Sequence, residues 1–281
     1  MTWNLNDVVL QCDNIVSLPE IYLKLTEKID RPETTNNELA DLIKLEPGVA
    51  SKLLTIVNSP FYGLAGTIST PAHAISIIGR NDFKNLVLGS SVVEVFRKLP
   101  CQVFTLHRYW EHCLLVAICC KLLGKHWRLN EDRELLFVAG LLHDIGKLVV
   151  AQVLPEQADL LAPVWQPVDG GRVVDSTGEE ALLGFTHAEA GAELLKAWGL
   201  PGLLQLAAGH HHQPELADSH QVALHIVYMA NVLASGEREV IEQSLEVCLQ
   251  VLGVEDSTEA LLELRDEAQQ EKAQLIGVYL S

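Results

Sequence analysis

The segment Leu141–Val150, LLHDIGKLVV, places a histidine and an aspartate side by side at the end of an apolar run. Lys147 follows one helical turn later. Imidazole and carboxylate groups are ligands that suit iron, manganese or zinc, but one His-Asp pair supplies too few of them. A metal site would therefore need further ligands from elsewhere in the chain.

Two histidines on other predicted helices are expected to face the interior. Residues 107–124 form an apolar helical pattern in which His112 shares a face with Tyr109 and Cys113. Residues 187–198 form another, and Thr186 with Glu189 predicts a capping box at its start. His187 is the first residue of that helix and is expected on its packed side.

The remaining candidates come from the next two helical patterns. His211 and His212 end the pattern at 201–212, which Pro201 opens. Asn231 shares an apolar face with Leu224 in the pattern at 220–235. A single buried histidine is more often a core residue with one hydrogen bond, but polar groups converging from separate helices are an established way to hold a metal in a bundle. The predicted metal ligands are His112, His143, Asp144, His187, His211, His212 and Asn231.

The elements that would position these residues are helical throughout. The N-terminal part contains short apolar patterns at 21–29, 36–46, 48–59, 71–79 and 81–96, each ended by proline, glycine or serine. Residues 98–100 separate this lobe from the region that carries the candidate ligands. We expect a small-helix lobe at 1–100, a helical bundle at 101–235 and acidic helices at 236–281. Residues 155–178, rich in Pro, Gly and Asp, are predicted to form a loop.

The C-terminal segment 236–281 shows two amphipathic patterns, the second opened by Asp256 and Glu259 as a cap. Its apolar side includes Leu261, Leu264 and Leu275. We interpret these helices as closing the bundle, with the surface of a homodimer as the alternative.

Composition narrows the function classes. The chain has 281 residues, of which 48% are hydrophobic, enough for a sizeable core. Its net charge of -17 opposes binding to nucleic acid or to anionic membranes. The six cysteines form no C-x-x-C pair, and the N-terminus has neither a basic segment nor a long apolar run. These features are typical of a cytoplasmic protein.

The motifs carry a family resemblance. The sequence HDIGK, with His112 before it and THAEAGAELLKAWGLP and HHQP after it, resembles the HD superfamily of metal-dependent phosphohydrolases. SLPEIYLKL, LEPGVASKLLTIVNSPFYG and ISTPAHAISIIG are similar to the N-terminal signature of the HDOD family, an HD-related output domain of bacterial signalling proteins. The resemblance implies an all-α fold in which an HD-like bundle joins a smaller N-terminal multi-helix lobe.

The resemblance also implies roles. His112 is the first ligand, His143 and Asp144 are the central pair, and Asn231 stands where the family has its closing aspartate. His187, His211 and His212 are the extra ligands of multi-metal relatives. Lys147 would contact a phosphate, although pairing with a surface carboxylate explains it equally well. In an enzyme, Asp144 and Lys147 would be the catalytic residues.

Two departures bear on activity. Arg108 stands where relatives that hydrolyse cyclic dinucleotides have an acidic ligand, and no GYP sequence follows the histidine pair, so cyclic-di-GMP hydrolysis is disfavoured. A hydrolytic two-metal site also needs several anionic ligands, and only Asp144 is placed by its motif. We expect one divalent transition metal per chain, iron, manganese or zinc.

The sequence therefore favours a non-catalytic signal-transduction module whose pocket binds a metal or a small ligand. The expected partners are signalling proteins or a small phosphorylated ligand. The alternative is a metal-dependent phosphohydrolase acting on a nucleotide or another phosphoester.

Overall fold

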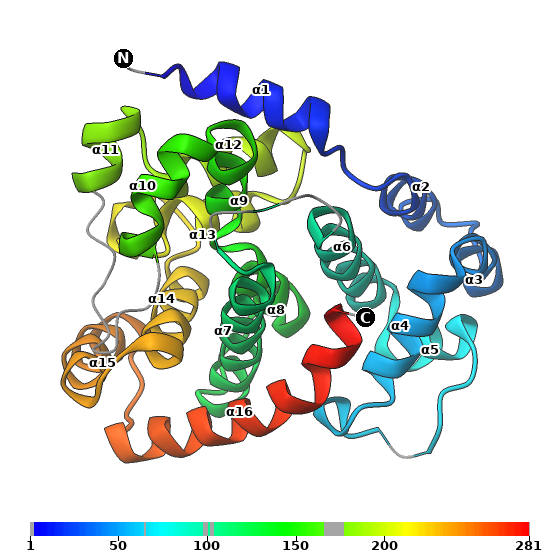
Figure 1. Ribbon diagram of the computed structural model, residues 1–281. Coiled ribbons are helices and arrows are strands. Elements are labelled where there is room, and N and C mark those ends of the chain that lie inside the picture. Colours follow the sequence, from blue (N-terminus) through cyan, green and yellow to red (C-terminus); the bar gives the residue numbers. More distant parts are fainter. Residues whose placement is uncertain (1–2, 65, 98–100, 102–103, 166–176, 281) are drawn as a thin grey trace. The chain divides into compact units, whose positions relative to one another are not determined.

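The computed structural model describes residues 3–64, 66–97, 101, 104–165 and 177–280 (Figure 1). Within these ranges the backbone forms helices joined by short turns, and no strand occurs. The all-α class predicted from the sequence is therefore confirmed.

The contacts of the chain divide it into two compact units. Unit 1 comprises residues 1–17 and 99–269, and unit 2 comprises residues 18–98 and 270–281. These units do not follow the three consecutive segments expected from the sequence, because the first 17 residues group with the bundle and the last 12 with the N-terminal lobe. The predicted boundary at 98–100 lies outside the described residues.

Unit 2 is a lobe of short helices whose ends follow local sequence signals. Thr35 and Glu38 form a capping box, and Pro47 and Pro71 each occupy a first helical turn. Gly79, at φ +89°, ends one helix in a conformation that favours glycine. The helices are α2 (Glu20–Ile29), α3 (Asn36–Lys44), α4 (Pro47–Val57), η1 (Pro60–Tyr62), α5 (Pro71–Ile78) and α6 (Arg80–Arg97). All five apolar patterns of this region thus form helices.

Unit 1 is the larger helical bundle. Its helices are α1 (Leu5–Ile15), α7 (Leu106–His126), α8 (Arg133–Leu142), α9 (Ile145–Val153), α10 (Pro155–Trp165), α11 (Thr177–Leu183), α12 (His187–Ala197), α13 (Gly202–His210), η2 (Pro214–Leu216), α14 (Gln221–Ser235) and α15 (Arg238–Leu252). The central helix α7 packs against α8 and α14, and α9 packs against α12, which also contacts α13. The helix α16 (Thr258–Leu280) begins in this unit.

Some helices of unit 1 were not expected, among them α1 and α10. The helix α1 starts at Asn4, whose side chain accepts a hydrogen bond from the backbone N–H of Asp7. The segment predicted as a loop at 155–178 instead begins with α10 and reaches α11, while residues 166–176 lie outside the described part. The loop prediction gave too much weight to proline, because Pro155 occupies the first turn of α10 and Leu161 and Trp165 lie buried one turn apart.

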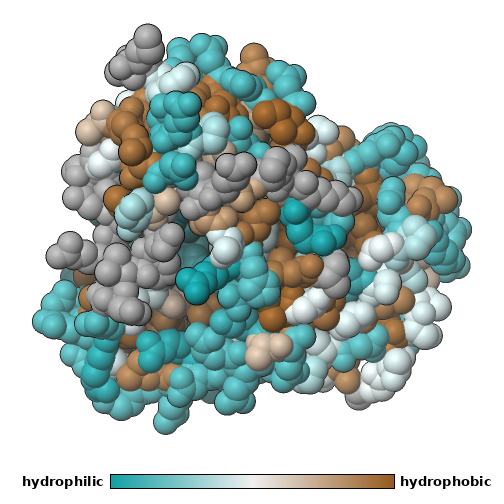
Figure 2. All heavy atoms as spheres, viewed as in Figure 1, coloured by the Kyte–Doolittle hydropathy of each residue, from teal (hydrophilic) through white to brown (hydrophobic). Residues whose placement is uncertain are grey.

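The acidic tail packs with its apolar side inward. The helix α15 contacts α14, and Leu261 and Leu264 of α16 are buried. The predicted cap needs correction: Ser257 accepts from the backbone N–H of Ala260, whereas Asp256 accepts from the indole N–H of Trp127. Hydrophilic side chains cover the outer side of the first part of α16, at the lower edge of the view (Figure 2).

The segment Arg133–Val153 has the length and composition of a membrane-crossing helix. However, 89% of its most apolar window is buried inside the fold, and the helix is interrupted at His143 and Asp144. This degree of burial is typical of a core helix in a soluble domain.

Candidate metal centre

Close packing of α8 on α7 brings the His-Asp pair beside His112. A Cβ atom at Gly140 would lie 2.8 Å from the Cα of Ala117, so only glycine allows this approach. One turn after Gly140, His143 ends α8 with its ring 5.3 Å from that of His112. The apolar periodicity of α7 thus predicted the inward position of His112 correctly.

A second close approach joins α9 to α12. A Cβ atom at Gly146 would lie 1.8 Å from the carbonyl oxygen of His187 and 2.7 Å from the backbone nitrogen of Gly191. Gly146 lies within α9 and does not have a positive φ, so no turn of the backbone requires glycine here. Glycine is needed here because α12 lies against it, and this contact brings His187 to Asp144.

Three histidines turn the same ring nitrogen toward the centre. The Nδ1–H groups of His143 and His211 donate to the carbonyl oxygens of Gly140 and Ala208, at 2.7 and 2.8 Å. Because a carbonyl oxygen only accepts hydrogen bonds, Nδ1 carries the proton in both rings. Each Nε2 is then left with a free electron pair, the form that binds a metal.

For His187, the acceptor at Nδ1 is the carboxylate of Glu179. Its carboxylate accepts from the backbone N–H of His187 at 2.7 Å and contacts Nδ1 at 2.7 and 2.9 Å. The indole N–H of Trp165 also donates to this carboxylate. Burial disfavours a charged imidazole, but Glu179 and Asp144 together outweigh burial and raise the pKa of His187. A carboxylate behind a metal-binding histidine is a common supporting arrangement, because it orients the ring and increases its basicity.

Three carboxylates lie near the start of α12 in the sequence: Glu179, Glu180 and Glu189. Glu180 is exposed, and Glu189 forms the predicted capping box with Thr186. Of these three, only Glu179 reaches the site. It contacts Nδ1 of His187 and is not itself among the candidate metal ligands.

Asp144 lies at the centre of the histidines. Its Oδ1 atom is 3.3 Å from Nε2 of His187 and 3.4 Å from Nε2 of His211. Its Oδ2 atom is 3.5 Å from Nε2 of His143 and 3.8 Å from Nε2 of His112. The carboxylate therefore has one oxygen directed at each of two groups of histidines.

Lys147 pairs with this same aspartate. Its ammonium group lies 2.7 Å from Oδ2 of Asp144, and both side chains are less than one-tenth exposed. The carboxylate that pairs with Lys147 is therefore a buried one, rather than the surface carboxylate considered from the sequence. Burial disfavours the charged form of Asp144, but Lys147 and His143 hold its pKa well below the usual range.

The remaining predicted ligands lie at the partly exposed side of the site. The side chain of His112 is 20% exposed, and the Asn231 side chain interacts with it. Burial lowers the pKa of His112 to about 4, so its imidazole is neutral at pH 7. Nε2 of His212 lies 3.4 Å from Nε2 of His187. Arg108 is exposed.

These residues fit a divalent metal on two grounds. The ligand atoms of His187, His211 and His212 lie within 4.8 Å of one another, as do those of His112, His143 and Asp144. Nε2 of His143 and Oδ1 of Asp144 are buried and have no hydrogen-bond partner. Buried polar atoms without a partner are costly, and a bound metal would satisfy both of these.

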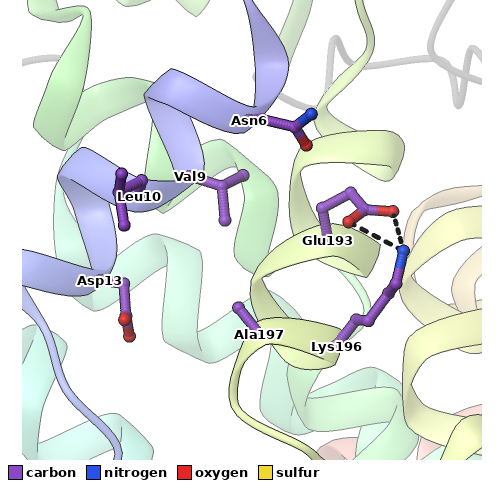
Figure 3. Close-up of a pocket in the computed structure, with 7 residues that line it drawn as sticks. All are labelled: Asn6, Val9, Leu10, Asp13, Glu193, Lys196 and Ala197. Carbon is purple, nitrogen blue, oxygen red and sulfur yellow. Dashed lines mark hydrogen bonds and ion pairs between the residues drawn. The ribbon is translucent and has the colours of Figure 1, made fainter.

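A groove elsewhere in unit 1 lacks such chemistry. It lies between α1 and α12, where Leu10 and Asp13 face Glu193 and Lys196 (Figure 3). Lys196 donates to Glu193 of its own helix, at 2.9 and 3.1 Å. None of the candidate ligands lines this groove.

Comparisons with known proteins agree with this fold. A crystal structure of an HDOD domain protein with unknown function from Geobacter sulfurreducens is 23% identical, with a TM-score of 0.77 over 98% of each chain. A "Putative phosphohydrolase" from Shewanella amazonensis SB2B is 22% identical, with a TM-score of 0.74 over 98% of each chain. At this level of identity, the similarities show the fold alone.

An uncharacterized protein from Treponema pallidum is 23% identical over 224 residues, which are 78% of this chain. The chain spans 42% of the length of that relative. Residues 15–214 match the HDOD domain, and this match covers most of the chain. Together with the helical fold, it shows that the chain belongs to the HDOD family.

Proposed function

We propose that this chain is a regulatory domain in which a buried metal centre of HD type has a structural or sensory role rather than a catalytic one. The proposal rests mainly on charge. Asp144 is the only carboxylate in the two ligand groups, and Lys147 already neutralises it. Two dications close together need several anionic ligands, so this centre is suited to a single metal ion.

The position of Asn231 supports the same conclusion. Its side chain contacts His112, at the place where the HD resemblance puts a final aspartate. An amide oxygen is a neutral and weaker ligand than a carboxylate, so this substitution removes one negative charge from the centre. The other nearby carboxylate, Glu179, is already bonded to His187, Trp165 and a backbone N–H.

In this role the metal would couple several helices, because its ligands come from α7, the α8–α9 turn, α12 and the end of α13. A domain that senses metal or transmits a signal needs such a coupled element. We propose signalling proteins as partners, with iron, manganese or zinc as the bound ion.

One observation favours the alternative, a metal-dependent phosphohydrolase. The two ligand groups lie on either side of Asp144, an arrangement that would let one carboxylate bridge two ions. A metal pair of this kind supplies an activated water for phosphoester hydrolysis.

Metal analysis and activity measurements separate the two functions. Protein purified without chelator should contain about one transition metal per chain and should not hydrolyse phosphoesters when manganese, iron or magnesium is supplied. Turnover that disappears in His143→Ala would show that the chain is an enzyme. Metal-free protein that takes up none of these ions would exclude both functions.

A further inference from the structure

The groove between α1 and α12 has an apolar lining. It has an open volume of about 230 Å³, and its apolar residues are Val9 and Leu10 of α1 and Ala197 of α12 (Figure 3). Leu10 is 61% exposed, whereas its neighbour Val9 is buried. A large apolar side chain exposed at the edge of a hollow is typical of a binding groove, because a partner can cover both at once.

The residues that line the groove are spaced by helical turns. On α1 they include Asn6, Val9 and Asp13, and on α12 they include Glu193 and Ala197. From Asn6 to Asp13 the α1 side extends for about 10 Å, because an α-helix rises about 1.5 Å per residue. A groove of this length between two helices matches about two turns of a third helix, whose apolar side chains recur with the same spacing.

The two helices that form the groove are acidic. The helix α1 carries Asp7 and Asp13, and α12 carries Glu189 and Glu193. Within these two helices Lys196 is the only lysine or arginine, and it donates to Glu193 at 2.9 and 3.1 Å. The groove therefore presents an excess of negative charge, and charge complementarity favours a basic partner.

We propose that this groove binds a basic amphipathic helix of a partner protein, whose apolar side chains cover Leu10 and whose lysine or arginine side chains face Asp13 and Glu193. This inference rests on the proposed function, because it gives the regulatory domain a surface for its signalling partner. The bound helix would lie along α12, which begins with the candidate metal ligand His187.

The probe is a synthetic peptide of about 18 residues, long enough to form a helix, with leucine on one face and lysine on the other. It should bind the wild-type protein, and binding should weaken as the salt concentration rises, because salt screens exposed charges. A peptide of the same pattern with glutamate in place of lysine should not bind. Hydrogen-exchange protection should increase in α1 and α12 more than in α10 and α15.

An apolar variant tests the lining of the groove. Leu10→Ser removes the exposed apolar contact and should weaken binding of the lysine peptide by about 10-fold or more. Leu160→Ser is the matched control, because Leu160 is 67% exposed on α10 of the same unit and does not line the groove. This control should leave the affinity unchanged. Urea unfolding of both variants checks that they fold as the wild-type protein does.

A second variant tests the charge. The indole N–H of Trp198 donates to Oδ1 of Asp13 at 2.9 Å. An asparagine oxygen can accept the same bond, so Asp13→Asn removes the charge and keeps this contact. The variant should bind the lysine peptide about 2- to 5-fold more weakly at low salt. Glu246→Gln, on the exposed side of α15, is the control and should leave the affinity unchanged.

The results distinguish the inference from the function on which it rests. The proposal is wrong if the lysine peptide does not bind, if the glutamate peptide binds equally well, or if Leu10→Ser and Leu160→Ser weaken binding equally. Dimers of the wild-type protein that Leu10→Ser removes would show that a second copy of the chain fills the groove instead. All of these outcomes leave the metal-binding domain intact. Peptide binding as predicted by a protein that takes up no metal would keep the groove and overturn the metal function.

Discussion

The two units of this chain use their interiors differently. Among the described residues of unit 2, the buried polar side chains are those of Thr34, Asn85, Ser90 and Ser91, none of which is charged at pH 7. Unit 1 buries Glu134, His143, Asp144, Lys147, Glu179, His187, His211 and His225. Burying ionisable groups costs free energy unless they are paired or bind a metal, so the candidate function lies in unit 1. Unit 2 is built mainly by apolar packing.

The largest expected effect comes from the close approach that assembles the site. Gly146→Ala places a methyl group against the backbone of His187, and overpacking of this severity should lower the free energy of unfolding by about 3 kcal/mol or more. Gly48 of α4, in unit 2, is the matched control, because a Cβ atom there meets nothing within 4 Å. Gly48→Ala should be neutral or slightly stabilising in urea unfolding. Equal stability losses in both variants would contradict this account.

Acid should destabilise the metal-free protein through unit 1. Burial lowers the pKa of His112 to about 4, and it also lowers the pKa of His143 and His211. Unfolded histidine titrates near pH 6.5, so the unfolded state binds more protons between about pH 6.5 and 4, and stability falls as the pH decreases. For His112 alone the loss is on the order of 3 kcal/mol by pH 4.

His187 acts in the opposite direction, because its pKa is raised; its contribution is complete below pH 6.5 and is lost as the pH rises through its folded pKa. Urea unfolding at several pH values, with amide hydrogen exchange, checks the balance. A stability that does not change between pH 7 and 5, or protection lost first in unit 2, would show that the buried histidines do not control the acid response.

Metal removal should also affect mainly unit 1. An ion at about 100 times its dissociation constant stabilises the folded protein by about 2.7 kcal/mol. Chelation should therefore lower Tm by several degrees and reduce the hydrogen-exchange protection of α12 and α13 more than that of α3 and α4. Equal loss of protection in both units would remove the proposed difference between them.

The smallest expected effect concerns the support behind His187. Glu179→Gln keeps the size of the side chain but removes the charge that orients this ring, and it should weaken metal affinity by about 10- to 100-fold. Its neighbour Glu180 is exposed, so Glu180→Gln should leave the affinity unchanged. Isothermal titration of both variants with zinc makes the comparison. Equal affinities would mean that Glu179 has no role in metal binding.

Much of the fold could be predicted from the sequence, because apolar periodicity and capping residues are local signals. The patterns around His112 and His187 predicted that both side chains face inward, and the structure places them near different oxygens of Asp144. The same signals were weaker for α1 and α10. The 11 residues of α10 end at Trp165 and contain regularly spaced apolar residues. Its prolines, Pro155 and Pro163, nevertheless favoured the prediction of a loop.

Other features depend on contacts between distant segments, which local patterns do not contain. Glu179 reaches His187 from another helix, and Lys147 pairs with Asp144 instead of a surface group. The role of Gly146 required knowing that α12 lies against it. The candidate ligands could thus be named from the sequence, whereas their contacts with Glu179 and Lys147 could not.

The most direct test of the central claim is the position of a bound metal. A crystal of the protein grown with zinc should show one strong anomalous peak in unit 1, about 2.0–2.2 Å from its ligand atoms, among the candidate ligands His112, His143, Asp144, His187, His211 and His212. A zinc-saturated crystal with no peak among these residues, while their side chains are ordered, would contradict the claim that unit 1 is built around a metal.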